Sequence, residues 1–145
     1  MNKILFLFFI LFSIFSSAAN QKVWEYQYSF NLKKDKIATV LVDKQANSKK
    51  NSKRYILKFR WTLYANKNLI LLSEYMKHPN QYVMKRIRSL DKVRIKLLQS
   101  ESDYGNAPYA LIIFSGFDEK KRVATLDVYI KDRKKRVQVV FKAPQ

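Results

Sequence analysis

Apolar and polar side chains alternate one by one along several stretches of this chain, and this pattern limits what the chain can fold into. Successive side chains of a β-strand point to opposite faces of a sheet, so a period of two predicts a strand with one buried face. In residues 23–32 the apolar face consists of Trp24, Tyr26, Tyr28, Phe30 and Leu32. In residues 54–64 it consists of Tyr55, Leu57, Phe59, Trp61 and Leu63.

Shorter segments of the same kind follow, with polar turns between them. The further predicted strands are residues 37–43, 69–76, 109–117, 122–131 and 136–141, of which 37–43 is expected to pair with 23–32 as a hairpin. The chain has only two glycines, which favours four-residue loops around type I turns over two-residue loops at positive φ. Short connections favour antiparallel neighbours. The sequence therefore predicts an all-β fold, an antiparallel meander of seven to nine strands forming a small barrel or sandwich.

Residues 81–99 fit two patterns. They can form two strands, 82–90 and 93–98, joined at Asp91 and Lys92. They can also form a helix, which would make the fold α+β, with Asn80 as N-cap and an apolar stripe of Val83, Ile87, Leu90 and Leu97. The β-branched residues in this segment and the neighbouring hairpins favour the strands.

The first 19 residues have the order of a secretory signal. A short basic start at Lys3 precedes an apolar run of 12 positions from Ile4 to Phe15, and small residues follow up to Ala19. A membrane-spanning helix needs about 20 apolar residues, so a cleaved signal is favoured over an anchor. Cleavage before Asn20 would leave a single basic domain, residues 20–145. Export is therefore expected, to the periplasm or alternatively to the extracellular space.

The net charge is large for so short a chain. It is +18, and removal of residues 1–19 takes away one lysine and no acid, which leaves +17. A charge of this size favours contact with an anionic envelope component, an acidic protein or, peripherally, a membrane. An AT-rich genome would also enrich lysine, asparagine and isoleucine, so the sequence leaves open whether the charge is functional or compositional.

Catalytic and metal-binding motifs are not recognisable in the sequence. There is no cysteine, the single histidine, His78, precedes a proline in a predicted turn, and two glycines cannot build a phosphate-binding loop. Zinc sites draw on cysteine and histidine clusters, which this chain lacks. We expect a protein that is not an enzyme and that carries no metal or cofactor.

Basic residues recur at a spacing of two in three predicted strands. They would point outward and could form a stripe that attracts phosphates. This predicted polyanion site consists of Arg54, Lys58, Arg60, Arg86, Arg88, Arg94 and Lys96. The nearby aromatics Phe59 and Trp61 are expected in the core, where they cannot stack on bases, so nucleic acid is not the expected partner.

The sequence thus predicts an exported, non-enzymatic binding or structural domain of the cell envelope. Its basic face would engage an anionic envelope component or an acidic protein. The alternative is a small β-barrel that carries an apolar or lipid ligand in an aromatic-lined cavity. The residues predicted to line that cavity are Trp24, Tyr26, Tyr28 and Phe30.

Overall fold

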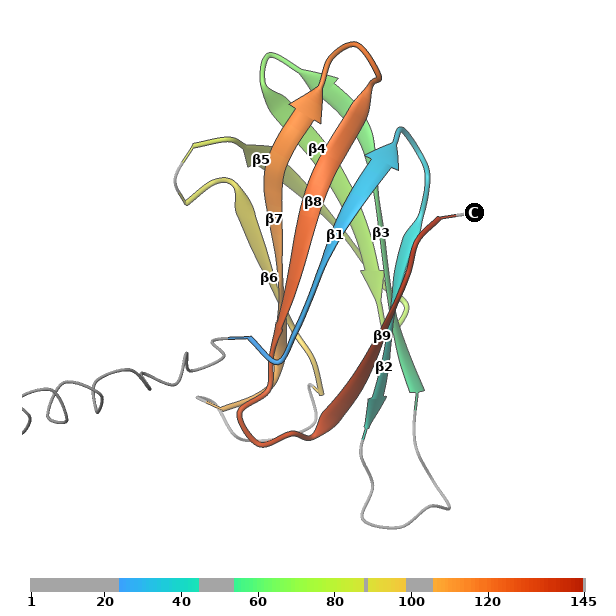
Figure 1. Cartoon of the computed structure of the whole chain (residues 1–145), viewed down its shortest axis with the longest axis vertical. Helices are drawn as coiled ribbons and strands as arrows, with labels where there is room; N and C mark the ends of the chain where they lie inside the picture. The colour runs from blue at the N-terminus through green and yellow to red at the C-terminus, as the bar shows by residue number, and fades with distance from the viewer. Residues whose placement is uncertain (1–23, 45–53, 88, 99–105, 145) are drawn as a thin grey trace, which may run out of the picture.

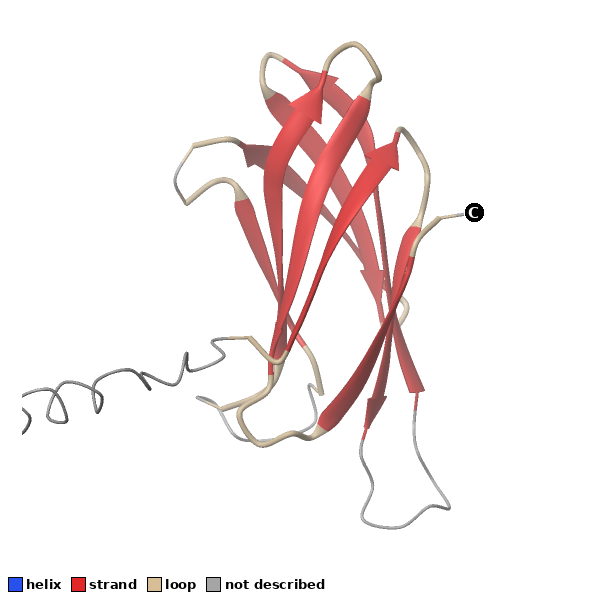
Figure 2. Cartoon of the chain, viewed as in Figure 1, coloured by secondary structure: helices blue, strands red, loops and turns tan. Residues whose placement is uncertain are grey.

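The computed structural model describes residues 24–44, 54–87, 89–98 and 106–144, and these form nine strands and no helix (Figures 1 and 2). The strands are β1 (Tyr26–Lys33), β2 (Ala38–Lys44), β3 (Arg54–Ala65), β4 (Asn68–Tyr75), β5 (His78–Lys85), β6 (Lys92–Lys96), β7 (Tyr109–Asp118), β8 (Val123–Lys131) and β9 (Val137–Lys142). The all-β prediction is confirmed. The predicted signal, residues 1–19, lies outside the described residues.

The strands form two antiparallel sheets that pack on one shared core (Figure 1). One sheet has four strands in the order β1-β8-β7-β6, and the other has five in the order β5-β4-β3-β2-β9. Strands β2 to β5 form one meander and β6 to β8 form another. The chain changes sheets between β1 and β2, between β5 and β6, and between β8 and β9.

Trp61 ties the two sheets together at the centre of the core. Its side chain is fully buried, and its indole Nε1 donates a hydrogen bond of 2.8 Å to the carbonyl oxygen of Leu32 in the opposite sheet. Its ring meets the ring of Phe117 edge to face, with centroids 5.5 Å apart. Buried indoles usually find such a partner for their N–H group. The hydrophobic effect is not directional, so this hydrogen bond fixes the orientation of the buried ring.

The segment 81–99 contains the end of β5 and the whole of β6, and the helical alternative is wrong. The predicted strand 82–90 is too long, because β5 ends at Lys85. The strands do not pair with each other, however. Strand β5 pairs with β4, whereas β6 pairs with β7 in the other sheet. The predicted hairpin between residues 23–32 and 37–43 is wrong for the same reason, since β1 pairs with β8 and β2 with β3 and β9. Alternation marks a strand but carries no information on its partner.

Two hairpins use tighter turns than the sequence predicts. Asn66 and Lys67 both have positive φ, at 50° and 62°, between the paired residues that end β3 and begin β4. Met76 and Lys77 repeat this, at 54° and 65°, between β4 and β5. Two successive positive φ values define two-residue loops of type I′, whose twist matches the strands better than a type I turn does.

The predicted turn at His78 and Pro79 is wrong, because both residues lie inside β5. Strand β5 has β4 as its only partner and forms an edge of the five-stranded sheet. Proline has no backbone N–H group to donate to a neighbouring strand. An edge strand tolerates proline because one of its two sides has no partner strand. The turn between β4 and β5 is instead formed by Met76 and Lys77.

Candidate anion-binding site

The outer face of the four-stranded sheet carries aromatic and basic side chains at one end. In β7 the buried residues Ala110, Ile112 and Phe114 point to the core, so Tyr109 points outward. Antiparallel register then places Tyr109 between Lys96 of β6 and Lys131 of β8. This row of one aromatic and two basic residues crosses three strands, and the sequence gives no sign of it because strand order brings it together.

Three aromatic rings pack together on this face. Trp24, just before β1, contacts Tyr129 with ring centroids 5.3 Å apart and meets Tyr109 edge to face at 6.1 Å. The guanidinium carbon of Arg94 lies 3.8 Å from the centroid of the Tyr109 ring, which is a cation–π contact.

A small polar pocket lies beside Tyr109 and Arg94. Its volume is about 220 Å³. It is lined by Arg94, Asn106, Ala107, Tyr109, Lys131 and Arg133, which we call the basic pocket. Three of these six residues are cationic and none is acidic. Pockets for drug-sized ligands span roughly 300–1,000 Å³, so this one suits a single charged group.

A network of hydrogen bonds fixes the walls of the basic pocket. Asp132, whose side chain is fully buried, accepts a hydrogen bond of 2.7 Å from the backbone N–H of Val137 and so closes the turn between β8 and β9. Arg136 lies 3.7 Å from the Asp132 carboxylate and donates to the carbonyl oxygen of Asn106. The β8–β9 turn, which carries Arg133, is thereby linked to the segment that carries Asn106.

Glu25 holds the same turn from the other side. Its carboxylate accepts a hydrogen bond of 2.7 Å from the backbone N–H of Asp132 and lies 3.6 Å from the Lys131 ammonium group. These bonds place Lys131 and Arg133 on rigid backbone. Oriented cations on a rigid frame bind an anion with less loss of conformational entropy than mobile side chains do.

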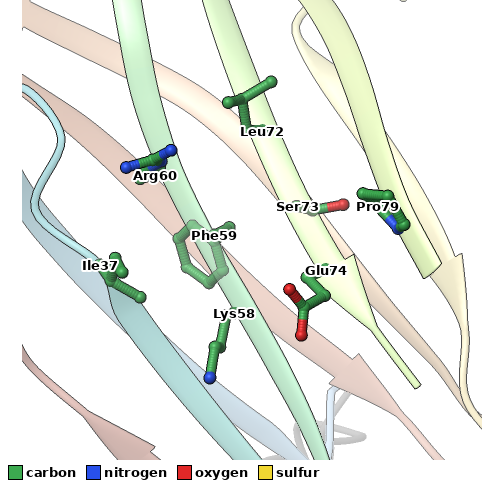
Figure 3. Close-up of a pocket in the computed structure, with 8 residues that line it drawn as sticks. All are labelled: Ile37, Lys58, Phe59, Arg60, Leu72, Ser73, Glu74 and Pro79. Carbon is green, nitrogen blue, oxygen red and sulfur yellow. The ribbon is translucent and has the colours of Figure 1, made fainter. Parts of the chain in front are cut away.

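Three residues of the predicted polyanion site lie on the opposite side of the molecule. Arg54, Lys58 and Arg60 are in β3, on the outer face of the five-stranded sheet. Lys58 and Arg60 border an open pocket of about 310 Å³ together with Ile37, Leu72 and Glu74 (Figure 3). This pocket differs from the basic pocket because a carboxylate, Glu74, faces Lys58 across the β3–β4 register.

Arg54 is engaged in an ion pair. Its Nε and Nη2 donate to the two carboxylate oxygens of Asp43 at 2.7 and 2.9 Å. This two-point contact lowers the pKa of Asp43, first through the hydrogen bond from Arg54 and further through the charge of Arg54, while desolvation acts in the opposite direction. Two N–H donors of Arg54 are therefore already engaged by Asp43.

The seven predicted residues do not form one stripe. Because β3 and β6 belong to different sheets, Arg94 and Lys96 lie on one outer face and the β3 residues on the other. Arg86 is exposed in the connection between β5 and β6, and Arg88 lies outside the described residues. The structure joins Arg94 to Lys131, Arg133 and Tyr109, which the sequence analysis missed. The basic run at 133–135 was the available signal.

The four residues of the predicted aromatic cavity do not line one space. Trp24 lies on the outer face, against Tyr129. Phe30 is inside the core, edge to face with Phe59 at 5.3 Å. Between them, Tyr28 is 43% exposed and stacks on Phe141, while the Tyr26 hydroxyl donates to the carbonyl oxygen of Val137. The alternation breaks before β1 begins, so Trp24 leaves the inward face.

Comparison with known proteins gives no relative: no protein family, no curated protein and no solved structure matches this chain. In the part of the chain that the structure describes, no helix is long and apolar enough to span a bilayer. The described residues also hold no group of three His, Cys, Asp or Glu side chains arranged to bind a metal ion.

Proposed function

We propose that this protein is an exported, non-enzymatic domain of the cell envelope that binds an anionic envelope component at the basic pocket. The observation that carries the proposal is the convergence of Arg94, Lys131 and Arg133 on a space of about 220 Å³. Arginine presents planar N–H donors that match phosphate and carboxylate oxygens. The ligand group is accordingly a phosphate or carboxylate carried on a larger molecule.

The surroundings of the pocket support this proposal over a purely compositional charge. Basic side chains that only keep a surface solvated lie apart from one another. These three line one space, and Asp132 and Glu25 hold the walls of that space. The net charge, which is +17 once residues 1–19 are removed, adds long-range attraction for any polyanion. The pocket selects within that attraction, because only a small charged group enters it.

The test is a binding assay across a salt series. The protein is recovered from the expressing cells, its N-terminus is determined by mass spectrometry, and binding to lipopolysaccharide, peptidoglycan and DNA is measured. The variant Arg94→Gln/Arg133→Gln removes two of the three cations of the pocket. The matched control, Lys58→Gln/Arg60→Gln, removes the same charge from the opposite face.

We expect one envelope component to bind more tightly than DNA and to stay bound near physiological salt. The pocket variant should lose at least about tenfold in affinity, and the slope of log affinity against log salt should fall by roughly one for each lost contact. The control should retain most of the affinity. Equal losses in both variants would show that binding follows total charge, and the proposal would then be wrong.

A further inference from the structure

The outer face of the five-stranded sheet exposes aliphatic side chains in a regular arrangement. Val140, Leu41 and Ile56 face each other across β9, β2 and β3 in register. Val140 is 48% and Ile56 is 42% exposed. These three residues form a continuous aliphatic row across three strands, on the side of the sheet that points away from the core.

A second row lies farther along the same face. Leu63, Ile70 and Val83 face each other across β3, β4 and β5, and Leu63 and Val83 are 54% and 56% exposed. Along β3 the two rows are separated by about 20 Å at the rise of an extended strand. Of the eight large apolar residues that are exposed in the described chain, these two rows hold four.

A band that contains cations separates the two rows. In register order it includes Lys142, Lys58 and Arg60, which come from β9 and β3. Glu74 is the acid of this band, and Asp43, beyond the first row, is paired with Arg54. Cations therefore exceed acids on a face that also presents two aliphatic rows. We call these two rows and the band between them the amphipathic face.

We propose that the amphipathic face docks on an anionic lipid surface, which is a second binding activity beyond the one proposed for the basic pocket. Exposed apolar patches of this kind mark interaction sites. Charge complementarity selects the occupant. A second copy of this chain would bring Lys58, Arg60 and Lys142 against themselves. An anionic bilayer offers phosphates to the cationic band and apolar material to the rows on both sides.

The two mapped surfaces lie on opposite outer faces, so a protein docked in this way keeps the basic pocket directed away from the membrane. Binding energy should come from both components of the face. Each basic residue near an anionic membrane adds electrostatic attraction, and each buried methylene adds hydrophobic free energy. Removal of either component should therefore weaken docking measurably.

The test is co-sedimentation with vesicles of phosphatidylcholine containing about one third phosphatidylglycerol, which approximates an anionic leaflet. The variant Ile56→Ser/Val140→Ser removes one aliphatic row without changing charge, and Lys58→Gln/Arg60→Gln removes charge from the band. The matched control is Ile87→Ser, which replaces an aliphatic side chain that is 60% exposed in the connection between β5 and β6. Circular dichroism verifies that every variant is folded.

We expect each variant of the amphipathic face to lose about tenfold or more in vesicle affinity, corresponding to at least 1.4 kcal/mol. Ile87→Ser and Arg94→Gln/Arg133→Gln should bind nearly as the unchanged protein does. Vesicle binding that survives Ile56→Ser/Val140→Ser, or that depends only on the basic pocket, would overturn the inference and leave the pocket proposal standing. Loss of lipopolysaccharide or peptidoglycan binding in Arg94→Gln/Arg133→Gln tests the basic pocket alone and does not bear on docking.

Discussion

The two outer faces of this protein belong to sheets that share one core, yet they offer different chemistry. On the four-stranded sheet, Trp24 packs on Tyr109 and Tyr129, and basic side chains surround a small polar pocket. On the five-stranded sheet, aliphatic rows remain exposed and the pocket at Lys58 and Arg60 is open. Similar alternating strands thus yield one face with a small cationic pocket and another that is an extended amphipathic surface.

The two faces also differ in how far their aliphatic side chains are exposed. In β7 the outward residues Leu111 and Ile113 are half-buried. In the other sheet Leu41 is half-buried as well, but its neighbours Ile56 and Val140 are exposed. An apolar side chain that is covered adds stability, whereas one that is exposed costs solubility and is retained more readily where it serves a contact.

The largest effect on stability is expected in the core that both faces share. Trp61→Ala removes a fully buried indole and its hydrogen bond to Leu32, so the free energy of unfolding should fall by about 3–5 kcal/mol. Urea unfolding followed by circular dichroism measures it. Leu63→Ala, on the same strand but exposed, should change it by less than about 0.5 kcal/mol. Similar losses in both variants would contradict the assignment of Trp61 as the link between sheets.

A smaller effect should separate the faces. Asp132→Ala leaves the Val137 N–H without its carboxylate acceptor and removes the partner of Arg136, which should cost about 2 kcal/mol of stability. Affinity at the basic pocket should fall, while vesicle docking should change little. The control is Asp118→Ala in the β7–β8 turn, where the carboxylate accepts from the Lys121 N–H at an exposed site. Parallel losses at both faces would contradict the separation.

The smallest effect concerns the five-stranded sheet alone. Because Arg54 lowers the pKa of Asp43, the pair stabilises the folded state above the ordinary carboxyl pKa of 3.8, and this contribution disappears as the pH falls through the lowered value. Asp43→Asn should therefore be slightly less stable at neutral pH, and the difference should vanish in acid. Chemical unfolding of both proteins from pH 7 to pH 2 checks this. A difference that persists at the lowest pH would have another cause.

Part of the site could be predicted because charge and alternation are local properties. Arg94 and Lys96 are correctly placed on an outward face by their spacing, since Val93 and Ile95 between them are buried. Tyr109 could not be placed, because both faces of β7 are apolar and no alternation marks its outward side. Lys131 and Arg133 join Arg94 only through the register of β6, β7 and β8.

The sequence by itself determined most of the strands of this protein and most of the side chains that enter the core. Trp24 and Leu63 are exceptions, since both were predicted on inward faces and lie outside. Side chains alternate in direction along a regular strand, so Phe59 and Trp61 could be assigned to the interior before any partner was known. The register shift between Trp61 and Leu63 interrupts the alternation and turns Leu63 outward. The tertiary structure decided which strands are neighbours, and with that the two faces. Strand pairing uses backbone groups that every residue carries, so closely similar alternating segments can pair in many orders. The packing of one shared core selects the order in which Arg94 meets Lys131 and Ile56 meets Val140 across Leu41.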